Sequence, residues 1–184
     1  MSHIKLNNDF PGIVGLLEYS PRTAQPLLEL AETLLRGPSP LSSGKREIIA
    51  SSVSFKNGCH FCHTSHGASA AHHFGGDLSL IDAIKKDFEH KEISPKLRAL
   101  LNIAHKVQQS GKKVTEEDVK KAREAGAGDQ DIHDTVLIAA TLCMYNRYVD
   151  GLGAWAPEEV KAYDEMGEQM AHQGYLRERE GTSF

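Results

Sequence analysis

Several features are scarce or missing in this sequence of 184 residues, and each shortage excludes a class of protein. Only three cysteines are present, too few for a secreted scaffold held together by disulfides. The longest apolar run, Val136 to Tyr145, is interrupted only by Thr141 and is far shorter than the roughly 20 residues of a membrane-spanning helix. The first six residues lack the apolar stretch and cleavage site of a signal peptide. We therefore expect a cytoplasmic protein with no membrane partner.

The sequence also lacks an excess of positive charge. The chain has 21 lysines and arginines against 25 aspartates and glutamates, which gives a formal net charge of -4. It contains no block of lysine or arginine, so we expect no nucleic-acid partner. Hydrophobic residues (40%) and charged residues (25%) occur in proportions typical of a globular protein. We expect one domain over residues 1–184, large enough for a substantial core.

Helical periodicity accounts for most of the chain, and no segment shows the alternation of a strand over a useful length. The middle of the helix expected at 129–149 is apolar nearly all round, so we expect it to be the central buried element or an oligomer seam. The prediction is an all-α fold with an irregular lead-in at residues 1–20 and a charged tail at residues 175–184. From caps and breakers, the helices are expected at about residues 22–36, 43–56, 59–75, 77–88, 94–110, 115–125, 129–149 and 157–173.

The most informative stretch is Cys59-His60-Phe61-Cys62-His63-Thr64-Ser65-His66. At about 3.6 residues per turn, Cys59, Cys62 and His66 lie on one face of a helix. Cysteines three apart on a helix have Cα atoms about 5–5.5 Å from each other, close enough for a disulfide. Thiols in the first turn of a helix have lowered pKa values, and His66 could take a proton from Cys62. The spacing is typical of a redox-active site.

A carboxylate for this site is expected from the preceding helix. Glu47 lies twelve residues before Cys59 and is followed by small residues along one stripe of its helix. Such a stripe lets a second helix approach closely, so that Glu47 could orient and polarise the imidazole of His66. In this scheme Cys62 is the nucleophile, and Cys59 resolves an oxidised sulfenate into a disulfide.

Two other interpretations of the cysteines remain open, because the same side chains could bind zinc or could be inert buried thiols. The zinc ligands would be Cys59, Cys62 and His66 with one of His63, Glu47 or His72. A second Cys-X-X-Cys or histidine pair at a suitable spacing is missing, which favours redox chemistry. We expect His60, His63, His72 and His73 to be solvated or packed side chains, and of these His63 is the one to examine because it adjoins Cys62. We expect Cys143 to be a small buried hydrophobe.

Together these residues resemble a known signature. Glu47, eleven intervening residues and Cys59-X-X-Cys62-X-X-X-His66 look like the motif of the AhpD-like alkylhydroperoxidases, in the carboxymuconolactone decarboxylase superfamily. Over roughly residues 20–155 the chain also resembles the peroxidase-related branch of that superfamily. The segments that carry this second resemblance are Ser39-Pro40-Leu41-Ser42, Asn57-Gly58-Cys59, Asn146-Arg147 and Asp150-Gly151-Leu152-Gly153.

The resemblance implies an AhpD-like multi-helix orthogonal bundle that assembles as a trimer or hexamer. It implies that Cys62 attacks a peroxide and that Cys59 then closes the disulfide. Glu47 and His66 would form the proton relay, and a dithiol such as a lipoyl-bearing protein would supply electrons, without a bound cofactor. The chain departs from the family at Phe61, where characterised members have a histidine before the second cysteine.

One main hypothesis follows. The protein is expected to be a thiol-dependent peroxidase or disulfide oxidoreductase with an antioxidant role, acting on a peroxide or a small disulfide. The alternative is a structural or sensor protein that binds metal through Cys59, Cys62 and His66. A third interpretation is a non-redox enzyme that uses only Glu47 and His66 for acid–base chemistry.

Overall fold

The computed structural model describes residues 2–87, 90 and 93–176. This part of the chain forms a single helical domain without strands, which confirms the all-α prediction. The elements are α1 (Gly12–Tyr19), α2 (Pro21–Leu35), α3 (Ser43–Asn57), α4 (His60–His73), α5 (Leu78–Lys86), α6 (Pro95–Gln109), the 3₁₀ turn η1 (Gly111–Lys113), α7 (Glu116–Glu124), α8 (Asp129–Gly151) and α9 (Val160–Gln173).

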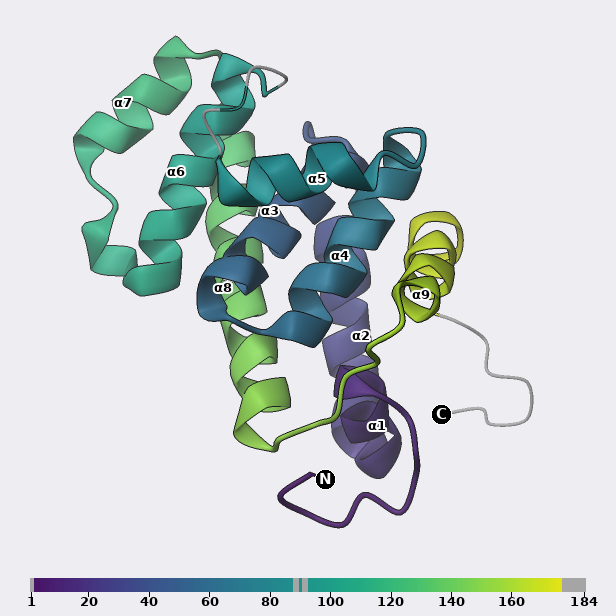
Figure 1. Ribbon diagram of the computed structural model, residues 1–184. Helices are drawn as coiled ribbons and strands as arrows, with labels where there is room; N and C mark the ends of the chain where they lie inside the picture. Colours follow the sequence, from purple (N-terminus) through teal and green to yellow (C-terminus); the bar gives the residue numbers. More distant parts are fainter. Residues whose placement is uncertain (1, 88–89, 91–92, 177–184) are drawn as a thin grey trace.

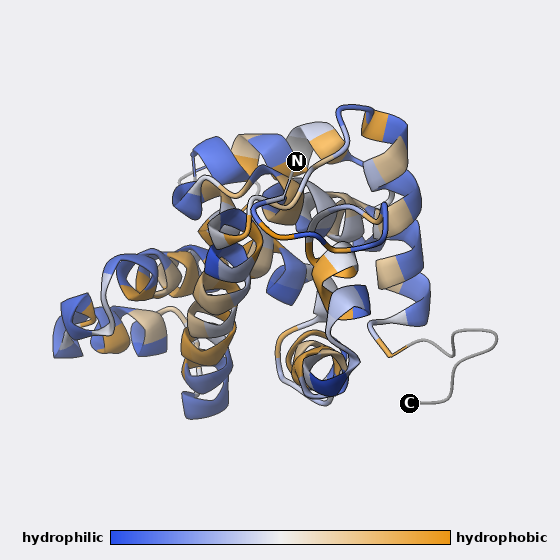
Figure 2. Ribbon diagram, turned by 90° about the horizontal axis from the view of Figure 1, so that it is seen from below, coloured by the Kyte–Doolittle hydropathy of each residue, from blue (hydrophilic) through white to orange (hydrophobic). Residues whose placement is uncertain are grey.

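Helices α3 and α4 lie side by side in the middle of the molecule, with α9 against the other side of α4 (Figure 1). Helix α8 packs against α3 and α6, and α7 packs on α6 at one edge. Most helices carry hydrophobic residues on one side and hydrophilic residues on the other (Figure 2), as amphipathic helices around a core should. The main core includes Ile49, Val53, Leu100, Ile138 and Leu142.

Helix α8 is buried on one face, which confirms part of the prediction that it is the central buried element. Ile138 and Leu142 in its middle are fully buried against α3 and α6. Leu137 and Met144 point outward instead, with 37% and 44% of their surface exposed. In the described part of the chain, no helix has the length and apolar character needed to cross a membrane.

The turn between α3 and α4 sets the position of the cysteine motif. Gly58 ends α3 with a φ of 77°, in the left-handed region that only glycine adopts at little cost. The N–H of Cys59 donates to the carbonyl of Ser54 at 3.1 Å, which closes the turn. Helix α4 therefore begins directly after Cys59, which is its N-cap, and Cys62 lies in its first turn.

The predicted irregular lead-in at residues 1–20 is wrong for the segment that forms α1. Ile13, Leu16 and Leu17 have the spacing of one helix face, and the two leucines are buried. The helix is only eight residues long, and it starts at Gly12 with a φ of 53°. So short a helix is stabilised by packing and not by its own sequence, which explains why the periodicity is a weak signal.

Several further boundaries differ from the prediction. The last helix begins at Val160 and not at Pro157, because the backbone of the preceding Glu159 is extended. The helix expected at 77–88 ends at Lys86, and the predicted residue 88 lies outside the described residues. Of the predicted charged tail, Tyr175 is packed into the protein, whereas residues 177–184 lie outside the described part.

Gly167 allows the close approach of α9 to α4. A Cβ at this position would lie 2.5 Å from the Cβ of Ala68 and 2.6 Å from its backbone carbon. We expect Gly167→Ala to lower the free energy of unfolding by about 1–3 kcal/mol, because α9 must move away from α4. In the control Gly151→Ala, a Cβ would meet nothing within 4 Å, so we expect no loss of stability. Urea denaturation measures both; equal stabilities would contradict the close packing.

Candidate active site

Cys59 and Cys62 lie at the start of α4 with their sulfur atoms 3.0 Å apart. Both are free thiols and both are buried, with 0% and 4% of their surface exposed. The thiol of Cys59 donates a hydrogen bond to the sulfur of Cys62. This hydrogen bond, together with burial and the nearby side chain of Asp150, raises the pKa of the Cys59 thiol. Cys59 therefore keeps its proton at neutral pH.

The two cysteines belong to an apolar cluster. Its other members include Leu16 of α1, Val149 of α8 and Tyr163 of α9, with Phe61 from α4 itself. The cysteine pair therefore lies between α4, the end of α8, α9 and the N-terminal region, away from bulk water. Only a small molecule, or a partner that displaces part of this cover, can reach the sulfurs.

The contact predicted between Glu47 and His66 is present. Nδ1 of His66 on α4 lies 2.7 Å from Oε2 of Glu47 on α3. The two helices approach closely along the small-residue stripe, where Ser51 donates to the carbonyl oxygen of His63 at 2.7 Å. A carboxylate can only accept, so we assign the proton of a neutral His66 to Nδ1, which leaves Nε2 as the basic nitrogen.

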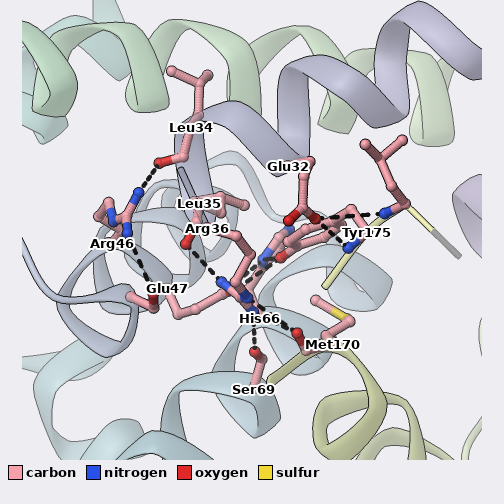
Figure 3. A network of polar contacts seen from close by, with 12 residues as sticks. Glu32, Leu34, Leu35, Arg36, Arg46, Glu47, His66, Ser69, Met170 and Tyr175 are labelled. Carbon is pink, nitrogen blue, oxygen red and sulfur yellow. Dashed lines mark hydrogen bonds and ion pairs between the residues drawn. The ribbon is translucent and has the colours of Figure 1, made fainter. Parts of the chain in front are cut away.

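Glu47 also contacts two residues that the sequence did not identify (Figure 3). Its Oε1 lies 2.6 Å from a guanidinium nitrogen of Arg36 and accepts a hydrogen bond from the hydroxyl of Tyr175 at 2.7 Å. Burial raises the pKa of the fully buried Glu47, but His66, Arg36 and Tyr175 outweigh burial and lower the pKa to about 2. Glu47 is therefore ionised at neutral pH and keeps His66 oriented.

The chain after α9 closes over this carboxylate. The backbone N–H of Tyr175 donates to Oε2 of Glu32 at 2.6 Å, and the guanidinium of Arg36 lies 5.1 Å from the Tyr175 ring centroid. Arg36 also donates to the carbonyl oxygen of Met170 at 2.8 Å. Residues from α2, α3, α4 and the end of α9 thus form one buried polar network around Glu47 (Figure 3).

The predicted site has two halves, the thiol pair and the pair of Glu47 and His66, and no hydrogen bond between described residues connects them. Among the described residues, His66 has its contacts with Glu47 and Tyr175, and no hydrogen bond links it to either thiol. Cys62 and His66 are one turn apart on α4, so the thiol pair and the carboxylate–imidazole pair are neighbours. A proton can pass between Cys62 and Nε2 of His66 only through a water molecule, a substrate or a side-chain rotation.

Phe61 and His63 take no part in the polar network. The ring of Phe61 lies against Gly12, where any Cβ would overlap it, and its centroid is 6.0 Å from that of Tyr163. His63 points toward α3, with its ring 5.4 Å from that of Phe55. Burial, with Lys85 and His60 nearby, lowers the pKa of His63 to about 4, so His63 is neutral at neutral pH.

The geometry gives no support to the zinc interpretation. Within the described ranges, no three His, Cys, Asp or Glu side chains are arranged so that they could hold a metal ion. Nδ1 of His66 is engaged by Glu47, and His72 pairs with Asp164 on α9 at 2.9 Å. The third cysteine, Cys143, is buried as predicted.

Comparisons with known proteins identify the fold. No family model and no curated protein matches the chain. A peroxidase-related protein of uncharacterised function from Ralstonia eutropha JMP134, described as an alkylhydroperoxidase AhpD core, superposes with a TM-score of 0.76 at 27% identity, over 85% of this chain and 80% of that one. A peroxidase-related protein from Silicibacter sp. TM1040 gives a TM-score of 0.75 at 24% identity, over 84% and 78%.

A third similar structure carries the name AhpD as well. It is a protein of unknown function from Agrobacterium tumefaciens, described as a candidate antioxidant defence protein. It superposes with a TM-score of 0.66 at 20% identity, over 78% of this chain and 97% of that chain. The protein described here therefore has the AhpD-like fold of the peroxidase-related proteins, as its cysteine motif predicted.

Proposed function

We propose that this protein is a thiol-dependent peroxidase with an antioxidant role. The observation that carries the proposal is the pair of free thiols 3.0 Å apart, one helical turn from a histidine held by an ionised glutamate. Cys59 and Cys62 supply two electrons, and Glu47 and His66 supply a base. The AhpD-like fold supports the same assignment.

In the first step, the Cys62 thiolate attacks one oxygen of a hydroperoxide. A sulfur–oxygen bond forms and the oxygen–oxygen bond breaks, so the sulfur is oxidised by two electrons and an alkoxide leaves. Nε2 of His66, having taken the Cys62 proton, returns it to the alkoxide, which departs as an alcohol. Glu47 stabilises the imidazolium that exists between these two proton transfers.

In the second step, the sulfur of Cys59 attacks the Cys62 sulfenic acid. A disulfide bond forms, the sulfur–oxygen bond breaks, and the oxygen leaves as water with the proton of Cys59. An external dithiol, for which a lipoyl-type protein is one candidate, then exchanges with the disulfide and restores both thiols. With a small disulfide as the oxidant in place of the peroxide, Cys62 would form a mixed disulfide and release one thiol, and Cys59 would release the second thiol as it closes the same protein disulfide.

We also propose that the protein forms a homo-oligomer, a trimer or hexamer as the resemblance implies. The outward-facing apolar side chains Leu137 and Met144 on α8 support an interface on that face. Light scattering would give the subunit number, and a monomer at micromolar concentration would contradict this part of the proposal.

A coupled peroxidase assay tests the proposed function. We expect wild-type protein to accelerate the consumption of an alkyl hydroperoxide by dihydrolipoamide, and Cys62→Ser to abolish the acceleration. Cys143→Ala is the matched control, since Cys143 lies outside the site, and it should retain the wild-type rate. Consumption by the wild type no faster than with dihydrolipoamide alone would contradict the proposal.

A further inference from the structure

Tyr163 on α9 has a buried hydroxyl group without a hydrogen-bond partner among the described residues. Only 3% of the residue is exposed. A buried hydroxyl that bonds to nothing costs about 1–3 kcal/mol, so such a group needs an explanation. The hydroxyl is the only polar group of the tyrosine side chain.

Other buried side-chain atoms without a partner are less costly. Nε of Arg46 belongs to a guanidinium that donates from Nη1 to the carbonyl of Leu34 at 2.9 Å. Oδ1 of Asp131 has no partner either, but the other oxygen of the same carboxylate, Oδ2, lies 2.7 Å from Nζ of Lys96. These side chains are partly satisfied, whereas Tyr163 leaves its whole polar group unused.

Tyr163 packs in the same apolar cluster as Cys59 and Cys62. Its ring centroid lies 5.8 Å from that of His60 and 6.0 Å from that of Phe61, the two residues between the cysteines in the sequence. Burial, and then the charges that Cys59 and Cys62 can carry, raise the pKa of Tyr163 to about 12. The phenol therefore keeps its proton at neutral pH and is close enough to both cysteines to be affected by their charge, but it donates to neither of them.

We infer that the hydroxyl of Tyr163 donates a hydrogen bond to the peroxide oxygen that is transferred to Cys62. This inference rests on the proposed peroxidase function. In the reduced protein no such oxygen is present, which explains why the donor has no partner. When the peroxide binds, its oxygen accepts the hydrogen bond. The free-energy cost of a buried hydroxyl without a partner is therefore removed only in the complex that goes on to react.

The hydrogen bond assists both oxidation and resolution. As the Cys62 thiolate attacks, the oxygen–oxygen bond breaks and negative charge develops on both oxygens, so a fixed donor in an apolar site stabilises the transition state. In the sulfenic acid, Tyr163 holds the same oxygen, which leaves as water when Cys59 attacks. Tyr163 gives up neither its proton nor an electron in either step.

Tyr163→Phe tests this inference, because it removes the hydroxyl and keeps the ring. We expect the second-order rate constant for oxidation of Cys62 by an alkyl hydroperoxide to fall roughly 10–100-fold, as when one oxyanion donor is lost. The rate is measured by quenching the reaction and counting free thiols. The variant should be at least as stable as the wild type in urea, since it loses a buried hydroxyl without a partner.

A second reaction separates an oxygen-directed role from a structural one. The second reagent is 5,5′-dithiobis(2-nitrobenzoate), with which the same thiolate would attack sulfur and no oxygen would be transferred. We expect Tyr163→Phe to leave this rate unchanged. The control Tyr145→Phe removes a buried hydroxyl that donates to the carbonyl of Leu27 at 2.6 Å, and it should lose stability and keep both rates.

The outcomes distinguish the inference from the function on which it rests. A slower peroxide reaction with an unchanged aromatic-disulfide reaction supports the role of Tyr163. If the wild type reacts with peroxide and the variant reacts equally fast, or is slowed equally with both reagents, the inference is overturned while the peroxidase proposal stands. If wild-type thiols do not react with peroxide, both are overturned.

Discussion

Replacing Cys59 with serine is expected to stop the reaction after one equivalent of peroxide and to leave Cys62 as a sulfenic acid. Serine keeps the size of the side chain at the N-cap of α4 but cannot attack the oxidised sulfur. The external dithiol normally reduces the protein by exchange with the disulfide between Cys59 and Cys62, and the variant cannot form this disulfide. Steady-state turnover should therefore fall at least about 100-fold, while the first oxidation step persists.

Mass spectrometry after trapping with dimedone measures this outcome. A dimedone adduct on Cys62 in the Cys59→Ser variant, and no adduct in Cys62→Ser, is the expected pair of results. An adduct on Cys59 in the Cys62→Ser variant, formed at the wild-type rate, would reverse the roles of the two cysteines. Full turnover by the Cys59→Ser variant would show that no disulfide is needed.

Replacing Glu47 with glutamine is expected to have the largest effect on stability. Glu47 is fully buried and pairs with Arg36, whose side chain is only 10% exposed. Removing one member of a buried pair leaves an uncompensated charge, which costs about 3–5 kcal/mol. Peroxide turnover should also fall by about 100-fold or more, since His66 loses the carboxylate that sets its proton on Nδ1.

The pH dependence of stability gives a second test at Glu47. Its pKa is lowered from the usual 4.5 to about 2 in the folded protein, so its contribution is fully present above about pH 4.5. The contribution is lost as the pH falls from there through 2. Urea denaturation at pH 6 and at pH 3 measures this effect. From pH 6 to pH 3, the free energy of unfolding should fall more in the wild type than in Glu47→Gln.

A surface carboxylate provides the matched control. Asp129 pairs with Arg123, but 86% of its side chain is exposed, so Asp129→Asn should change stability by less than about 1 kcal/mol. Equal losses in Glu47→Gln and Asp129→Asn would contradict a structural ion pair at Glu47. A Glu47→Gln variant whose stability depends on pH as steeply as that of the wild type would contradict the lowered pKa.

The sequence predicted what depends on local spacing. The caps and breakers located the helices from α2 to α9 to within a few residues, and the contact between Glu47 and His66 followed from one glutamate and a stripe of small residues. The Cys-X-X-Cys spacing likewise predicted two thiols within disulfide reach. These features depend only on helical geometry, and the spacing of residues in the sequence determines their positions on a helix.

The sequence did not reveal what depends on contacts between distant segments. Tyr175 meets Glu47 across 128 positions of the chain, and Arg36 reaches the carbonyl of Met170 across 134. Neither residue lies in a motif, and Tyr175 was placed in a charged tail. The unpartnered hydroxyl of Tyr163 is equally invisible in a sequence, because it is a property of packing between α4 and α9.

The most direct test of the central claim is the identity of the thiols that one equivalent of peroxide consumes. Reduced wild-type protein is treated with alkyl hydroperoxide, blocked with an alkylating reagent and mapped by mass spectrometry. We predict a disulfide between Cys59 and Cys62 in each chain, with Cys143 alkylated. Three alkylated cysteines, or oxidation at Cys143 while Cys59 and Cys62 stay reduced, would contradict the peroxidase proposal.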